Sequence, residues 1–174
     1  EEGERSFSLT FTAEHVSTGE QGVDFAWQGL ISGSEDGVIV CEMDGAARTA
    51  FWRNRIGWCV LHPMELAGEP VQIRTGDQVV ESRFPELISP HQPFFNIEEM
   101  THRTAHGDEI SIAFAGDVFE TEDQRNWTDA SYKTYSTPLE LPYPVRLEAG
   151  ERVKQSVTLT ARVDQVIEPA ESDQ

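Results

Sequence analysis

The stretch SFSLTFTAEHV, Ser6 to Val16, decides the fold class of this chain. Phe7, Leu9 and Phe11 would lie on one face of an extended strand, and serine and threonine residues would lie on the other. An alternation of two residues is typical of a half-buried β-strand, because successive side chains of a strand point to opposite faces. We therefore expect a strand here whose apolar face is buried.

Further runs have the composition of strands and follow one another at short intervals. Residues that are β-branched or aromatic fill VDFAWQGLISG, GVIVCEMDG and AFWRNRIGWCVLHP, and glycine, serine and aspartate separate these runs. Later pairs of runs flank hairpin turns at Gly76-Asp77, Gly116-Asp117 and Ala149-Gly150. Helical periodicity is nearly absent. The sequence predicts an all-β chain folded as an antiparallel β-sandwich, with a closed barrel as the alternative.

The length and the charge of the chain limit its class. Its 174 residues suffice for one core, so we expect a single domain over residues 1–174 that ends in a polar tail, residues 168–174. Because 31 acidic residues oppose 13 lysines and arginines, the net charge is -18. Such a charge disfavours binding to nucleic acid or to an anionic membrane surface, and no apolar stretch is long enough to span a bilayer. We expect neither partner.

The two cysteines, Cys41 and Cys59, are too few for the disulfide framework of a secreted domain. Each lies in an apolar run that reads as a strand, so we expect two buried free thiols. This cysteine usage favours a reduced, cytoplasmic location.

The segment FETEDQRNWTDASYKTY, Phe119 to Tyr135, has the densest mixture of functional side chains. A recognition surface needs aromatic rings that cover the apolar face of a ligand and polar groups that orient it. This segment supplies both, which favours a functional site over an ordinary solvated loop. Its candidate residues are Asp123, Arg125, Asn126, Trp127 and Lys133.

Two arginines lie in WRNRIGWCVLHP. Arg53 and Arg55 are two residues apart on a predicted strand, so they would point the same way and could form a forked receptor for a carboxylate. The alternative is that they balance acidic neighbours.

Two histidines are candidate proton carriers, because imidazole titrates near neutral pH. His62 ends the same predicted strand. His91, with Gln92, lies in SRFPELISPHQPF, Ser82 to Phe94, where three prolines predict a long, stiffened loop. Either histidine could instead be a hydrogen-bonded structural residue.

The standard cofactor and hydrolase motifs are absent from the sequence. There is no HExxH, no paired CxxC, no GxSxG, no Walker loop and no GxGxxG. His102 and His106 are four residues apart, but they read as a strand that leads to a turn rather than as a helical metal site. We therefore expect no cofactor and no metal. Carboxylates, arginines, amides and aromatic rings together suit a hydroxylated small molecule, and sugar chemistry is the natural class.

From roughly Phe7 to Leu159 the chain resembles the bacterial D-apionate lactonases, multidomain proteins of sugar-acid catabolism. The resemblance is carried by RNRIGWCVLHP, ESRFPELISPHQPF and FETEDQRNWTDASYKTYSTPLELPYP. It implies that this chain is the amino-terminal β domain of a longer protein, followed by a TIM-barrel domain and a further domain. A first residue other than methionine agrees with a fragment. The implied activity is hydrolysis of a branched-pentose aldonolactone, D-apionolactone, to its acid.

A shorter likeness concerns NRI at Asn54 to Ile56, which is similar to a strand sequence of the sugar mutarotases. It implies a supersandwich of the galactose mutarotase type.

Two hypotheses for function follow. In the first, the domain contributes to a lactone-hydrolysing site that takes a sugar lactone or sugar acid. Asp123 or a histidine deprotonates water, Arg125 or Lys133 stabilises the oxyanion, and other polar or aromatic groups hold the ring.

In the second hypothesis, the domain is a non-catalytic β module that binds carbohydrate or acts as a scaffold, or a mutarotase-like sugar-binding protein. Internal salt bridges and backbone caps would then occupy the side chains between Gln124 and Lys133. The catalytic candidates are His62, His91, Asp123, Arg125 and Lys133, and the substrate-binding candidates are Arg53, Arg55, Gln92, Asn126 and Trp127.

Overall fold

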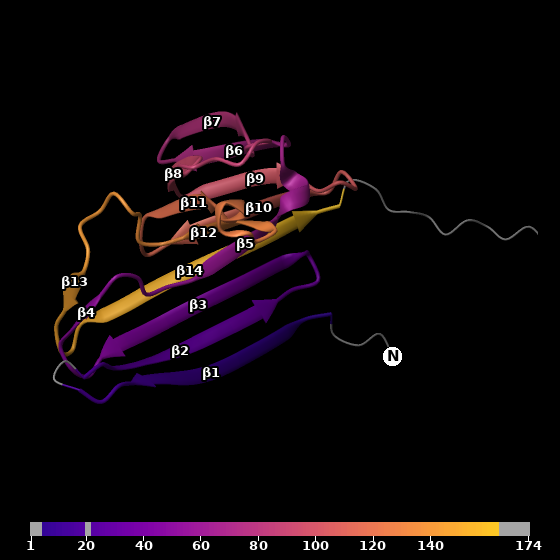
Figure 1. Cartoon of the computed structure of the whole chain (residues 1–174). Helices are drawn as coiled ribbons and strands as arrows, with labels where there is room; N and C mark the ends of the chain where they lie inside the picture. Colours follow the sequence, from indigo (N-terminus) through magenta and orange to yellow (C-terminus); the bar gives the residue numbers. More distant parts are fainter. Residues whose placement is uncertain (1–4, 20–21, 164–174) are drawn as a thin grey trace, which may run out of the picture.

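The computed structural model describes residues 5–19 and 22–163, so the polar tail predicted for residues 168–174 lies outside the described residues. Three antiparallel sheets make up this part of the chain (Figure 1). The largest has eight strands in the order β1 (Phe7–Val16), β2 (Asp24–Gly33), β3 (Val38–Ala47), β14 (Arg152–Arg162), β10 (Glu109–Ala115), β9 (Glu99–Arg103), β6 (Pro70–Thr75) and β7 (Gln78–Arg83). The all-β, antiparallel prediction is confirmed.

Two smaller sheets accompany the large one. One has four strands in the order β5 (Cys59–Pro63), β12 (Ser131–Tyr135), β11 (Phe119–Asp123) and β8 (Phe94–Ile97), and the other pairs β13 (Val145–Leu147) with β4 (Phe51–Arg53). Two short 3-10 turns, η1 (Met64–Leu66) and η2 (Gln124–Trp127), interrupt the strands. Among the described residues no helix has the length and apolar character that crossing a membrane requires.

The core consists of two clusters, one beneath each small sheet. Apolar side chains from β6, β9, β10 and β14 meet the four-stranded sheet in the larger cluster, where Met100, Phe119 and Tyr132 have no exposed surface. Phe25 and Met43 from the large sheet meet Phe51 of β4 and Leu147 of β13 in the smaller cluster. Face-to-face packing of sheets through apolar side chains defines a β-sandwich.

One of the three predicted hairpins forms, and the other two turns have a different role. The turn at Gly76-Asp77 joins β6 to β7, which pair as expected. The turn at Gly116-Asp117 instead leads from β10 in the large sheet to β11 in the four-stranded sheet, and Ala149-Gly150 leads from β13 to β14. At Gly116, φ is +93° and a Cβ would lie 2.1 Å from the carbonyl oxygen of Lys154, so this crossing requires glycine.

The predicted strand AFWRNRIGWCVLHP is divided. Arg53 ends β4, and Arg55 lies in the loop before β5, so the two arginines do not share a strand face. The buried amide of Gln155 holds this loop, because its Oε1 accepts from Trp58 N (3.0 Å) and its Nε2 donates to Ile56 O (3.1 Å). A Cβ at Gly57 would lie 2.0 Å from that amide, so only glycine allows this approach.

Two predictions of burial are wrong. Phe7 and Leu9 of β1 are 55% and 54% exposed, because neither small sheet extends over this edge strand. Cys59 is exposed and Cys41 is partly buried. Cys59 lies on the outward side of β5, an edge strand of the four-stranded sheet.

Candidate functional site

The segment Phe119 to Tyr135 forms β11, η2 and β12, and the strand period divides its side chains between two faces. Asp123 pairs with Tyr132 on the face that meets the core, and Glu122 pairs with Lys133 on the outward face. The two faces have different chemistry, because one is packed against the large sheet and the other is lined by ionisable groups.

On the inner face, the buried Asp123 forms an ion pair with the partly buried Arg125. Asp123 has no exposed surface, and its carboxylate accepts from Arg125 Nε (2.9 Å), from a terminal amino group of Arg125 (2.8 Å) and from Ser89 N (2.9 Å). Burial alone would raise the pKa of Asp123, but the hydrogen bonds from Arg125 and from backbone N–H groups lower it below its ordinary value. Arg125 also donates to Pro85 O (2.7 Å) and Glu86 O (3.1 Å). The pair therefore fastens the proline-rich loop to the hairpin.

Other predicted site residues also help to attach the proline-rich loop to the hairpin. Asn126 Nδ2 donates to the carbonyl oxygens of Ser89 and Asp123. The backbone carbonyl of His91 accepts from Ser89 Oγ (2.7 Å). These contacts give Asn126 a structural use and place His91 in a loop held by its own hydrogen bonds.

His62 is a core residue. It is 2% exposed, its Nε2 lies 2.8 Å from Thr134 Oγ1, and its ring packs beside Phe84 and His102. Burial, with a smaller contribution from His102, lowers the pKa of His62 to about 3. The structural alternative therefore describes His62 better than a role as proton carrier. None of the three cavities described below is lined by His62, His91 or Asp123.

On the outer face of the hairpin lies a small cavity of about 250 Å³, which we call the tyrosine pocket. Lys133 Nζ lies 3.2 Å from Glu122 Oε2 and 5.1 Å from the centre of the Tyr135 ring, and the Arg55 guanidinium lies 4.7 Å from the same ring. Trp127 Nε1 donates to Glu122 Oε1 (3.1 Å) at its margin. Six residues line this pocket: Arg55, Cys59, Glu122, Lys133, Tyr135 and Leu139.

A buried carboxylate fixes the ring of Tyr135. Glu120 has no exposed surface, and its Oε1 accepts from Tyr135 Oη (2.6 Å) and from Leu139 N (2.8 Å). Burial and the hydrogen bond to Glu120 raise the pKa of Tyr135, while a hydrogen bond with Gln92 opposes this change. Tyr135 is therefore a neutral, oriented ring. Sequence reasoning did not select Tyr135 or Glu120, and the available signal was their position within the functional segment.

A second, larger cavity of about 700 Å³ adjoins the first through Arg55, and we call it the tryptophan pocket. Its walls include Trp27, Trp52 and Trp58, and the rings of Trp27 and Trp58 meet edge to face at 6.0 Å. Its polar lining includes His15, which accepts from Trp27 Nε1 (3.1 Å). The tryptophans were also missed, because on the sequence they resemble ordinary core residues of strands.

The two predicted arginines meet at this cavity although they share no strand. A terminal amino group of Arg53 donates to Thr137 Oγ1 (3.1 Å), and Arg55 Nε donates to Thr137 O (3.0 Å). Among the described residues, the terminal amino groups of Arg55 have no hydrogen-bond partner. Arg55 thus presents donors where the two pockets join, an arrangement that suits an anionic or carbonyl oxygen.

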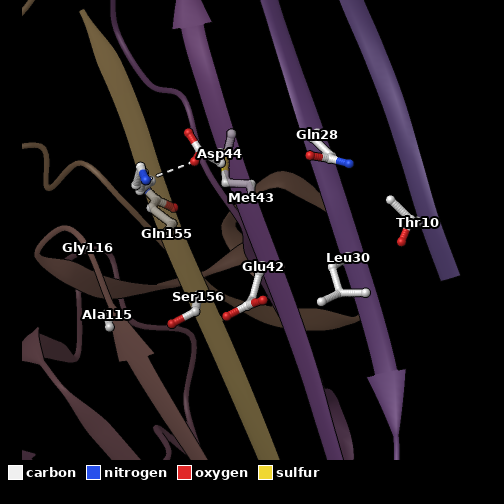
Figure 2. A pocket seen from close by; sticks show the side chains of 11 residues that line it. Thr10, Gln28, Leu30, Glu42, Met43, Asp44, Ala115, Gly116, Gln155 and Ser156 are labelled. Carbon is white, nitrogen blue, oxygen red and sulfur yellow. Dashed lines mark ion pairs between the residues drawn. The ribbon is translucent and has the colours of Figure 1, made fainter. Parts of the chain in front are cut away.

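A third hollow, of about 500 Å³, lies on the opposite face of the large sheet (Figure 2). Its cation, Lys154, is paired with Asp44 at 2.9 Å, and Arg152 is paired with the same carboxylate. Glu42 adds a further carboxylate to its lining. Because both cations are already paired with a carboxylate, this face is the weaker candidate for binding an anion. Within residues 5–19 and 22–163, no group of three or more histidine, cysteine or acidic side chains is arranged to hold a metal ion.

Comparison with known proteins gives a family and a fold. Residues 1–164 match the family described as D-apionate lactonase, N-terminal domain. The D-apionate lactonase of Brucella anthropi is 35% identical over 161 residues, which cover 91% of this chain and 26% of that protein. The chain therefore spans about a quarter of the length of this curated relative.

Solved structures of an aldose epimerase homologue and of a galactose 1-epimerase have a similar fold. An aldose epimerase homologue from C. elegans has a TM-score of 0.55 at 9% identity, over 90% of this chain and 66% of that one. Galactose 1-epimerase from Lactobacillus acidophilus has a TM-score of 0.54 at 7% identity, over 92% of this chain and 64% of that one. The predicted likeness to the galactose mutarotase fold is confirmed.

Proposed function

Because the chain belongs to the D-apionate lactonase N-terminal domain family, we propose that it is the β domain of a sugar-acid lactonase and binds a branched-pentose lactone or its acid where the tryptophan and tyrosine pockets join. D-apionolactone and D-apionate are the ligands that the family suggests.

Arg55 carries this proposal. Its terminal amino groups are free of hydrogen bonds among the described residues, it lines both pockets, and Lys133 lies on the same Tyr135 ring. A carboxylate or lactone carbonyl can accept from Arg55 while the sugar carbons lie against tryptophan rings. The negative charge of the chain as a whole makes such a local pair of cations more informative.

The domain binds rather than hydrolyses in this proposal. Asp123 and Arg125 are occupied by each other and by the proline-rich loop, and His62 is buried. These internal contacts are those that the non-catalytic hypothesis predicts. The group that activates water would then come from another domain of the longer protein, and the resemblance to the lactonases suggests a TIM barrel, whose strand ends commonly carry catalytic groups.

Calorimetric titration of the chain with D-apionate, and with a neutral pentose as the comparison ligand, tests the proposal. We expect the acid to bind, the neutral sugar to bind at least tenfold more weakly, and Arg55→Gln to weaken binding of the acid by about tenfold or more, since hydrogen bonds to charged groups contribute about 1.5–3 kcal/mol. Arg152→Gln, which removes a cation from the opposite face, is the matched control and should leave affinity unchanged.

Equal affinities of the wild type and Arg55→Gln for D-apionate, or a failure of the wild type to bind it, would contradict the proposed binding site. The chain alone should not open aldonolactones. Turnover by the chain that Asp123→Asn abolishes would restore the hydrolytic hypothesis.

A further inference from the structure

A strip of apolar side chains on β1, β2, β3 and β14 is exposed at Phe7, Leu9 and Ile39 and only partly buried at its other positions, although it faces the side on which both small sheets pack. We call it the β1 strip, and it consists of Phe7, Leu9, Phe11, Ile31, Ile39 and Leu159. The register places these residues on one face, because Leu9 pairs with Ile31 and Ile39 pairs with both Gly33 and Leu159. In Figure 1, β1, β2 and β3 form one side of the large sheet, away from β6 and β7.

The strip is flat because glycines lie beneath its aromatic rings. A Cβ at Gly33 would lie 2.3 Å from the Phe7 ring, and a Cβ at Gly29 would lie 2.3 Å from the Phe11 ring. Both rings therefore rest on the backbone of β2. Side chains held in this way present a smooth, ordered apolar surface, and contiguous apolar surfaces of soluble proteins mark interaction sites.

The strip runs into the tryptophan pocket. The Phe11 ring meets the Trp27 ring edge to face at 5.1 Å, and Trp27 lines that pocket. A protein domain that covers the strip would therefore also reach the tryptophan pocket at the side of Trp27. Ligand sites often lie at such boundaries between domains.

We propose that the β1 strip binds a further domain of the same polypeptide and that this domain closes the tryptophan pocket at the side of Trp27. Closure of the pocket rests on the function proposed above, whereas docking on the strip does not.

The length of a relative and the path of the chain favour this occupant. The Brucella anthropi lactonase has about three quarters of its length outside the segment that this chain matches. At the end of β14, Ala161 N donates to Gly37 O (2.9 Å) in the β2–β3 connection, so this end of the strand lies beside the part of the strip where Phe7 pairs with Gly33. The carboxyl end of β14 thus lies next to the strip.

A second copy of the chain is a poorer occupant. Two copies would bring together net charges of -18 each, and like charges oppose self-association.

Cysteine labelling tests the docking. In a background that carries Cys41→Ser and Cys59→Ser, Leu9→Cys and Val79→Cys are compared in the 174-residue chain and in the product of the complete open reading frame that encodes it. Val79 is the matched control, because it is 57% exposed on β7, the strand at the other edge of the same sheet. Circular dichroism confirms that each variant folds.

We expect maleimide to modify Leu9→Cys at least tenfold more slowly in the longer product and Val79→Cys at the same rate in both. Equal rates for Leu9→Cys, or a reading frame that ends at Gln174, would overturn the proposal. Labelling of Leu9→Cys in the 174-residue chain that slows as protein concentration rises would assign the strip to a second copy instead. The labelling uses no ligand, so failure to bind D-apionate leaves its outcome unaffected.

Discussion

The two faces of the β11–β12 hairpin differ in what their polar groups are free to do. On the inner face, Asp123 and Tyr132 have no exposed surface, and hydrogen bonds tie them to Arg125 and to the proline-rich loop. On the outer face, Glu122 and Lys133 remain partly exposed beside the tyrosine pocket. Neighbouring residues of one segment thus have different roles: those on the inner face stabilise the fold, and those on the outer face are accessible to a ligand. A dense cluster of functional groups in a strand should be divided by its two-residue period before roles are assigned.

Breaking the inner face should have the largest effect. Arg125→Ala leaves the Asp123 carboxylate buried without its cation, and breaking one partner of a buried pair costs about 3–5 kcal/mol. Urea denaturation measures the free energy of unfolding. Arg152→Ala, which breaks an exposed ion pair with Asp44, is the control and should leave the unfolding midpoint unchanged. A loss below about 1 kcal/mol for Arg125→Ala would mean that the pair is not a structural element.

The buried histidines should make stability depend on pH. The pKa of His62 is lowered to about 3 in the fold, and burial also lowers the pKa of His102. Between about pH 6.5 and pH 3 the unfolded chain binds protons that the native chain does not, so stability is lost as pH falls through this window. Each such histidine contributes a slope of up to about 1.4 kcal/mol per pH unit.

His62→Gln tests this dependence, because an amide can still bond to Thr134 but does not titrate. Urea midpoints at pH 7, 6 and 5 should fall less steeply in the variant than in the wild type. Parallel slopes would show that His62 takes up its proton at the same pH in the native and in the unfolded chain.

Changing the outer face should have the smallest effect on stability. Lys133→Met removes a partly exposed ion pair with Glu122, so we expect the free energy of unfolding to change by about 0.5 kcal/mol or less. Its affinity for D-apionate should nevertheless fall by about tenfold, because a cation beside Tyr135 is lost. Lys154→Met, on the opposite face, should change neither quantity. A destabilisation as large as that of Arg125→Ala would remove the contrast between the two faces.

Much of the fold followed from local patterns. Alternation predicted β1, and β-branched and aromatic runs predicted most other strands and the all-β class. The turns after β10 and β13 were placed correctly, but the strands on either side of each turn do not pair with one another as predicted. The turns at Gly116 and Gly150 each connect strands of different sheets. Strand pairing depends on contacts such as that of Asp44 with Lys154, which are distant in sequence.

The candidate site followed only in part. Arg53, Arg55 and Lys133 lie at the two pockets, but for the arginines the reason is a loop held by Gln155 rather than a shared strand face. Asp123 and Arg125 were chosen for their charged side chains, and in the structure these side chains form an ion pair with each other. Residue type indicates what a side chain can do, whereas burial decides whether anything reaches it.

The sequence by itself determined the strand-forming character of the chain, its family and the alternation of apolar and polar side chains along strands such as β1. These properties are local or are carried by contiguous motifs. Only the tertiary structure decided which apolar faces are covered: Phe119 of β11 is fully buried, whereas Phe7 of β1, whose strand has the clearer alternation, is 55% exposed. The physical reason is that a strand fixes the directions of its own side chains, but the layer that packs on them comes from distant parts of the polypeptide.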